Sequence, residues 1–238
     1  MCSESDKDKN IVEIRPIAYI YNDFDEKFGI PRQSGLAPSI KSVIVFEKPY
    51  RNREALRGID GYSHLWLIWQ FSQCDGKWSP TVRPPRLGGN KRIGVFATRS
   101  PFRPNGLGLS SVTFEGIEHT EKNGDVLIVS GADLMNGTPI FDIKPYVAYS
   151  DSHSNAVCSF ADTFSDYGLT VNCDENLISK IPESKRNGLK EILRCDPRPS
   201  YQSDPDRVYV LVYSGFEVKF SVRENVLTVG SIEEKDYD

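Results

Sequence analysis

The stretch RIGVFATRSPFRPNGLGLSS, residues 92–111, decides how the chain is interpreted. It begins with an apolar run, residues 93–97, whose length and composition predict a buried strand. A loop follows in which two prolines and a glycine restrict the backbone, while two arginines and an asparagine supply hydrogen-bond donors. A second apolar segment, residues 107–114, again predicts a strand. A rigid polar loop between two strands is typical of a ligand-binding loop held by a scaffold.

The composition is that of an ordinary soluble chain. Its 238 residues, 39% hydrophobic and 26% charged, suffice for one sizeable domain and a smaller one. Residues 1–10 have no apolar core and mix both charge signs, so they match neither a signal peptide nor a transit peptide and predict a disordered tail. The longest apolar runs, such as residues 65–69, are too short to cross a bilayer. We therefore expect a cytoplasmic protein with no membrane partner.

Charge and cysteine usage narrow the class further. The five cysteines are odd in number and contain no C-x-x-C pair, which argues against a disulfide framework and a structural zinc site, so we expect no metal. The formal net charge is −4, yet residues 77–103 hold seven basic side chains and no acid. This basic stretch predicts a local cationic surface on an otherwise acidic protein, which suffices to attract phosphate.

Short apolar segments recur up to about residue 150 without regular helices between them. They predict strands over residues 11–21, 43–47, 63–71 and 125–130, with one short helix over residues 51–57. This pattern favours an antiparallel barrel over a doubly wound sheet. Neither a G-x-G-x-x-G turn nor a P-loop is present, so loops would have to hold a nucleotide cofactor. His64 lies within an apolar segment and is interpreted as a hydrogen-bonded core residue.

The chain divides into four parts. After the tail, residues 11–150 form the barrel, within which residues 23–38 are a long loop that composition alone would make a surface connection. Residues 151–170 are polar and irregular and predict a linker or flexible insertion. Residues 171–238 contain an amphipathic helix and three strands, and therefore predict a small α+β domain.

Several motifs together resemble the TrmO family. They are RIGVFATRSPFRPN from Arg92, VRPPRLGG from Val82, GTP from Gly137, DIKPY from Asp142, PRQ from Pro31, SHLW from Ser63 and DPRP from Asp196. The similarity covers nearly the whole chain. It departs where Asn-Gly-Leu-Gly, residues 105–108, replaces the Asn-Pro-Ile/Leu-Gly of the family, because losing that proline makes the loop less rigid.

Members of this family are S-adenosylmethionine-dependent tRNA methyltransferases. The resemblance implies a mainly β chain, with a TsaA-like antiparallel β-barrel domain and a small α+β C-terminal domain. It also implies methyl transfer to the N6 amine of threonylcarbamoyl-adenosine at position 37, next to the anticodon, and suggests a homodimer. By the same resemblance the cofactor pocket would use Gln33, Ser34, Gly35, Phe71, Ser72, Arg99, Leu109, Gly137, Thr138, Pro139 and Ile140.

The catalytic candidates are Asp142, Lys144 and Tyr146. They fall at period two, so an extended segment would project all three side chains onto one face. Asp142 is the candidate base for the amine proton, with Lys144 and Tyr146 orienting it or binding the carboxylate of the modified base. A structural ion pair between Asp142 and Lys144 explains the same spacing equally well.

Five residues are candidates for RNA contacts: Arg83, Arg86, Arg103, Asn105 and Arg198. Arg83 and Arg86 accompany Trp78 in a proline-stiffened loop, where basic and aromatic side chains could hold the backbone and stack on a base. Each RNA contact has an alternative. Arg83 and Arg86 could simply be solvated, Arg103 and Asn105 could brace their loop by hydrogen bonds, and Arg198 could have a packing role. At the level of function, a non-catalytic module that binds S-adenosylmethionine or a nucleotide and a methyltransferase with a non-RNA substrate remain alternatives. The basic stretch favours a large anionic substrate.

Overall fold

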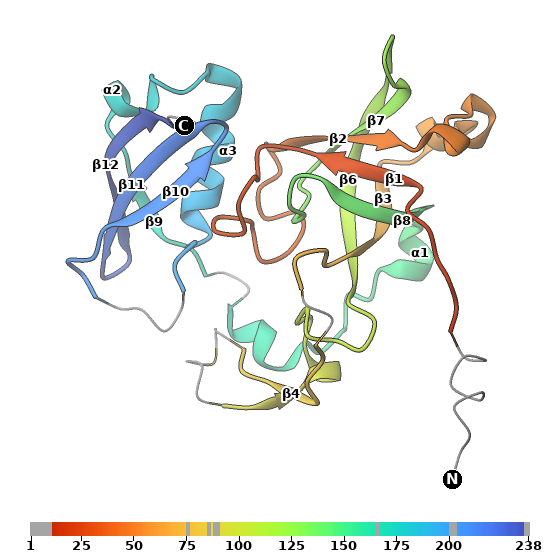
Figure 1. The fold of residues 1–238 in the computed structure, drawn as a ribbon. Helices are drawn as coiled ribbons and strands as arrows, with labels where there is room; N and C mark the ends of the chain where they lie inside the picture. Colours follow the sequence, from red (N-terminus) through yellow and green to blue (C-terminus); the bar gives the residue numbers. More distant parts are fainter. Residues whose placement is uncertain are drawn as a thin grey trace.

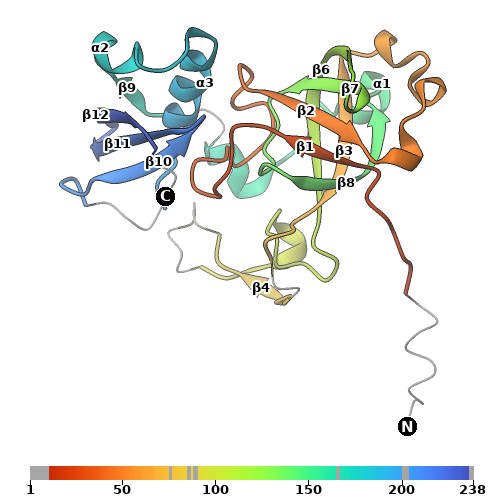
Figure 2. The same cartoon turned by 45° about the horizontal axis from the view of Figure 1, so that its top comes forward.

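The computed structural model describes residues 11–74, 77–84, 87, 91–164, 167–199 and 204–235. A closed barrel and a four-stranded sheet lie side by side, and a smaller two-stranded arm projects below the barrel (Figures 1 and 2). No helix in the described ranges combines the length and the apolar character that a membrane crossing requires. The mainly β architecture predicted from the sequence is confirmed.

Six antiparallel strands form the barrel. In spatial order they are β1 (Ala18–Tyr21), β2 (Lys41–Phe46), β7 (Gly124–Ser130), β6 (Leu107–Thr120), β3 (His64–Gln70) and β8 (Thr138–Pro145), and β8 pairs with β1 to close the ring. Alternate residues point inward: Leu65 and Leu67 of β3 are fully buried, while His64 and Gln70 are exposed. The predicted antiparallel barrel is therefore present, and β3 shows the two-residue period of a strand with one face in the core. Short 3₁₀ helices connect β2 to β3: η3 (Lys48–Tyr50), η4 (Arg53–Leu56) and η5 (Ile59–Gly61).

Two sequence predictions of strands need correction. Residues 93–97 do not form one buried strand: only Ile93–Gly94 (β5) is extended, paired with Thr81–Val82 (β4), and Val95–Ala97 forms the 3₁₀ helix η7. Phe96 is 75% exposed. A five-residue apolar run has the composition of a core strand, but this one belongs to the two-stranded arm outside the barrel. In the first predicted strand, only Ala18–Tyr21 is extended in a sheet.

The C-terminal unit packs helices on one sheet. Its strands are β10 (Tyr209–Tyr213), β11 (Phe216–Arg223), β12 (Val226–Glu234) and β9 (Thr170–Asn172), the last parallel to β12, and its helices are α2 (Glu175–Ile178) and α3 (Glu183–Arg194). Gly188 in α3 allows a close approach, since a Cβ there would lie 2.5 Å from the Tyr213 hydroxyl. The segment before this unit contains α1 (Ala148–Asp151) and η8 (Ser159–Phe164).

The connection between β1 and β2, residues 22–40, joins the two units, and we call it the bridging loop. Phe24, Ala37 and Ile40 from this loop are buried in the same hydrophobic cluster as Leu189 and Leu211 of the C-terminal unit. Figure 2 shows the loop reaching from β1 to α3. The core of the C-terminal unit is therefore completed by residues that belong to the barrel segment of the sequence.

Candidate functional site

An open pocket of about 500 Å³ lies on the outer face of the barrel, across β3 and β6. Small-molecule sites usually measure about 300–1,000 Å³. The lining residues are Ser34, His64, Trp66, Arg99, Leu109, Ser111, Tyr146 and Asp151. The pocket thus brings together three of the predicted cofactor residues, Ser34, Arg99 and Leu109, with one predicted catalytic residue, Tyr146.

Strand register explains which side chains reach the pocket. Trp66 of β3 lies opposite Ser111 of β6, and both face outward because their neighbours Leu65 and Val112 face the core. His64 shares this outward face and is exposed, so its interpretation as a core residue was wrong. The signal was available in the alternation of β3, where His64 and Trp66 occupy the same parity.

Aromatic contacts form one wall of the pocket. The ring of Tyr146 lies 5.6 Å from that of Trp66 and 6.0 Å from that of His64, centroid to centroid. The Trp66 indole Nε1 donates to Asp151 Oδ2 at 2.7 Å, and the backbone N of Val147 donates to the same oxygen at 3.0 Å. The Val147 bond and then the Trp66 bond hold the pKa of Asp151 below its ordinary value. An ionised carboxylate therefore stands beside an electron-rich aromatic surface.

A second wall of the pocket is supplied by the bridging loop and Arg99. The Arg99 guanidinium donates to the Gln33 side-chain oxygen, and the backbone N of Gly35 donates to Gly131 O at 2.8 Å. These bonds place Gln33, Ser34 and Gly35 at the pocket edge. Arg99 itself is exposed.

Asp133, which sequence reasoning missed, lies behind this wall. Its carboxylate accepts from Ser110 Oγ at 2.5 Å, and Ser110 accepts from the indole Nε1 of Trp69 at 2.9 Å. Burial raises the pKa of Asp133 above its ordinary value, although the Ser110 hydrogen bond and the charge of Arg99 oppose that rise. Only the three-dimensional proximity of the β7–β8 turn, β6 and Arg99 reveals this carboxylate.

The remaining predicted cofactor residues do not line the pocket. Phe71 packs edge-on against Trp69 at 4.3 Å, and Ser72 follows it at the exit of β3. Gly137 lies in the turn before β8, while Thr138, Pro139 and Ile140 are buried. The Thr138 hydroxyl donates to Met135 O at 2.7 Å.

Asp142 and Lys144 form an ion pair on the outer face of β8, with 2.9 Å between Oδ2 and Nζ. Their side chains are 45% and 61% exposed, and they lie opposite Ile68 and Trp66 of β3. This contact places two of the three residues, Asp142 and Lys144, on one face, and it is the ion pair that the sequence offered as the alternative. Neither side chain lines the pocket, whereas Tyr146, two residues on, does.

The segment around β4 and β5, described within residues 77–105, carries basic side chains and exposed aromatic rings, and we call it the basic arm. Trp78, Phe96 and Phe102 are 53%, 75% and 48% exposed. The guanidinium of Arg103 lies 5.9 Å from the Phe96 ring centroid and donates to Thr98 O at 2.6 Å, which is the bracing arrangement considered above. Arg83 and Asn105 are exposed, and Arg86 lies outside the described residues.

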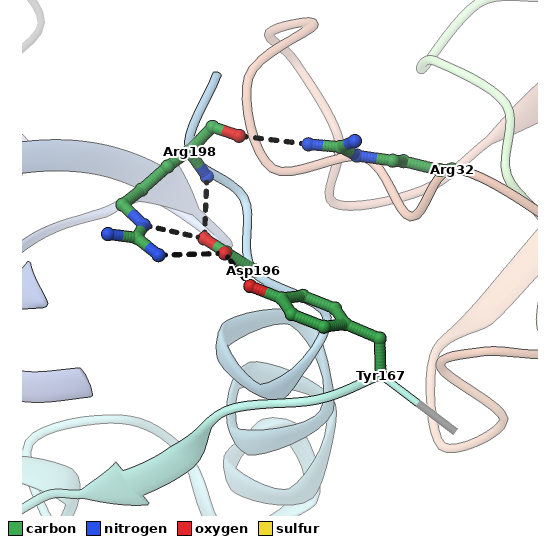
Figure 3. Close-up of polar contacts among 4 residues, drawn as sticks. All are labelled: Arg32, Tyr167, Asp196 and Arg198. Atoms are coloured by element: carbon green, nitrogen blue, oxygen red, sulfur yellow. Dashed lines mark hydrogen bonds and ion pairs between the residues drawn. The ribbon is translucent and has the colours of Figure 1, made fainter. Parts of the chain in front are cut away.

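Arg198 forms an ion pair with Asp196 (Figure 3). Its Nε and Nη2 atoms donate to the two carboxylate oxygens of Asp196 at 2.8 and 2.9 Å, and its side chain is only 13% exposed. This ion pair corresponds to the packing role that is the alternative to RNA binding for Arg198.

Comparison with known proteins shows which family has this architecture. The model described as "tRNA-methyltransferase O N-terminal domain" matches residues 19–152, and the model described as "TrmO C-terminal domain" matches residues 169–235. The chain belongs to the TrmO family. It is 35% identical over 230 residues to the Escherichia coli protein named tRNA (adenine(37)-N6)-methyltransferase, covering 93% of this chain and 97% of that protein.

Other members of the family agree in sequence and fold. A human protein with the same name is 37% identical over 198 residues, which cover 79% of this chain and 42% of that protein. A solved structure described as "Crystal structure of TrmO" superimposes with a TM-score of 0.76 at 33% identity, covering 93% of this chain and 99% of that one. The barrel and the C-terminal unit therefore both belong to the TrmO fold.

Proposed function

We propose that the protein transfers the methyl group of S-adenosylmethionine to the N6 atom of a threonylcarbamoyl-modified adenosine at position 37 of tRNA. Membership of the TrmO family supports the coarser part, a tRNA (adenine-N6)-methyltransferase. The observation that carries the proposal is the meeting of Ser34, Arg99, Leu109 and Tyr146 at one pocket from four separate parts of the chain. The threonylcarbamoyl group is the finer element, and it comes from the family resemblance.

The pocket suits the chemistry of S-adenosylmethionine. Arg99 offers a guanidinium to the methionine carboxylate, and the faces of Trp66 and Tyr146 offer an electron-rich surface to a cationic sulfonium. Two further relatives carry S-adenosylmethionine in their names. We assign further cofactor contacts to Gln33 and Gly35 at the pocket edge. Contacts from Phe71, Ser72 and residues 137–140, which do not line the pocket, are proposed from the family resemblance alone.

The bound cofactor supplies a methyl group already activated by the sulfonium charge, so the protein has to align the acceptor and exclude water. We assign Asp142 as the acceptor of the N6 proton. Lys144 holds this carboxylate by the observed ion pair, and Tyr146, two residues after Lys144, lines the pocket. Asp142→Asn should lower kcat with an almost unchanged Kd for S-adenosylmethionine. Unchanged turnover would remove Asp142 from the mechanism.

We assign tRNA binding to the basic arm. Arg83 and Asn105 are exposed there, and Arg86 and Arg103 add positive charge. The exposed aromatic rings of this arm, those of Trp78, Phe96 and Phe102, suit stacking on unpaired bases. The anticodon loop of a tRNA offers both phosphates and unpaired bases. We further propose a cytoplasmic homodimer, in which a second copy would cover the exposed side chain of Leu109 beside the pocket.

Nucleoside mass spectrometry of tRNA from cells with and without the protein tests the assignment. The proposal predicts loss of one methylated, threonylcarbamoylated adenosine when the protein is absent. Identical nucleoside profiles would leave the alternatives, a binding module or a methyltransferase with another substrate.

A further inference from the structure

The C-terminal unit holds the bridging loop by polar contacts as well as by the shared core. Ser39 donates through N and Oγ to the carboxylate of Glu191 at 2.9 and 2.7 Å, and Lys235 pairs with Glu26 at 2.8 Å. Lys185 also pairs with Asp23. Side chains of the C-terminal unit therefore contact the loop near its beginning, at Asp23 and Glu26, and near its end, at Ser39.

One contact adjoins the cofactor pocket directly. The Arg32 guanidinium donates to the backbone carbonyl of Arg198 at 2.9 Å (Figure 3). The next two residues along the loop are Gln33, which accepts from Arg99, and Ser34, which lines the pocket. The position of this carbonyl is consequently linked to the pocket edge through a single side chain.

The Arg198 carbonyl follows a hydrogen-bonded network whose Asp196 and Arg198 side chains are only 10% and 13% exposed. Asp196 has a positive φ of 54°, accepts two hydrogen bonds from the Arg198 side chain, and accepts a third from the Tyr167 hydroxyl at 2.6 Å. Burial alone would raise the pKa of Asp196, but the bonds from Arg198 and Tyr167 lower it, so the carboxylate is ionised at neutral pH. A bidentate, largely buried pair of this kind allows little freedom to the backbone between its members.

We propose that Arg198 and Arg32 are positioning residues, through which the C-terminal unit sets the pocket edge for S-adenosylmethionine. The network Tyr167–Asp196–Arg198 fixes the carbonyl that receives Arg32, and Arg32 in turn fixes Gln33 and Ser34 against Arg99. The role of this part of the C-terminal unit is then to shape the cofactor site. This inference rests on the proposed use of S-adenosylmethionine, and it differs from the RNA contact assigned to Arg198 from the sequence.

Binding measurements on the full-length protein test the proposal. Isothermal titration calorimetry should show that Arg32→Ala and Arg198→Ala each raise the Kd for S-adenosylmethionine about five- to tenfold, the scale of one typical lost hydrogen bond. The Kd for tRNA and its salt dependence should stay within about twofold of the original protein. Arg186→Ala is the matched control, because Arg186 also donates to backbone carbonyls, those of Ile181 and Ser179, at 2.9 and 3.1 Å, without touching the bridging loop. It should lower the melting temperature and leave both Kd values unchanged.

The double variant adds a test of the connection. If Arg198 acts through Arg32, combining both substitutions should raise the Kd for S-adenosylmethionine no further than the stronger single change; multiplied effects would mean separate routes and overturn the proposal. Weaker tRNA binding with a shallower salt slope in Arg198→Ala alone would return Arg198 to the RNA surface. If the unsubstituted protein binds no S-adenosylmethionine, the proposed function itself is refuted. If it binds S-adenosylmethionine with the same Kd as both variants, only this inference is refuted.

Discussion

Arg99 provides the sharpest test of how the pocket recognises its cofactor. We predict that Arg99→Ala weakens binding of S-adenosylhomocysteine, because the guanidinium is the one basic side chain among the residues that line the described pocket apart from His64. A hydrogen-bonded pair with a charged partner contributes about 1.5–3 kcal/mol. Arg99 is exposed, so solvent screening places the loss near the lower limit, about tenfold in Kd.

The assay compares two ligands by calorimetry. S-adenosylhomocysteine carries the amino-acid carboxylate, whereas methylthioadenosine has the same nucleoside and sulfur without it. Arg99→Ala should weaken the first ligand about tenfold and change the second less than about twofold. Equal losses for both ligands would refute a carboxylate contact and indicate that Arg99 acts only by holding Gln33 and the bridging loop.

Three further predictions follow from charges and packing. Asp133 has a folded pKa above its unfolded value, so its ionisation destabilises the fold as pH rises from the unfolded pKa through the folded pKa. Asp133→Asn should therefore raise the melting temperature at pH 7, and this gain should shrink as pH falls. A gain that does not depend on pH would contradict the burial argument. Asp196 has a folded pKa below its unfolded value, so it contributes stability that is lost as pH falls through the folded pKa. Asp196→Asn should lower the free energy of unfolding, measured in urea at pH 7, by about 3 kcal/mol. A loss below about 1 kcal/mol would argue against a tight pair with Arg198. Arg83→Ala should reduce the slope of log K for tRNA against log salt by about one with an unchanged melting temperature, and an unchanged slope would remove Arg83 from the RNA surface.

The barrel could be predicted because its strands carry a local signal. Both β3 and β7 contain short, continuous apolar runs of strand length, and such runs can be detected without information from the rest of the chain. The same local logic failed for residues 93–97. Their composition is that of a core strand, but only the fold shows that Gly94 and Phe96 stand on the arm outside the barrel.

The site was predictable in part, through the family motifs. These pointed to Ser34, Arg99, Leu109 and Tyr146, which do meet at the pocket. Asp133 and Asp151 escaped, since their significance depends on partners 23 and 85 residues away, Ser110 and Trp66.

Arg198 shows the opposite limit. A basic residue in a shared motif suggests RNA binding, but a carboxylate two residues earlier, in a left-handed backbone conformation, turns toward the guanidinium and neutralises it. Nothing in the sequence alone indicates that Asp196 adopts this conformation or that Arg32 will reach the Arg198 carbonyl.

The central claim is methyl transfer to a tRNA adenosine, and a labelled reaction with purified components measures it directly. The full-length protein would be incubated with tRNA from cells that lack it and with S-adenosylmethionine deuterated at the methyl group, followed by nucleoside mass spectrometry. The account predicts one product, a threonylcarbamoylated adenosine whose N6 carries the intact deuterated methyl. Label absent from that nucleoside, or found on a different base, would contradict it.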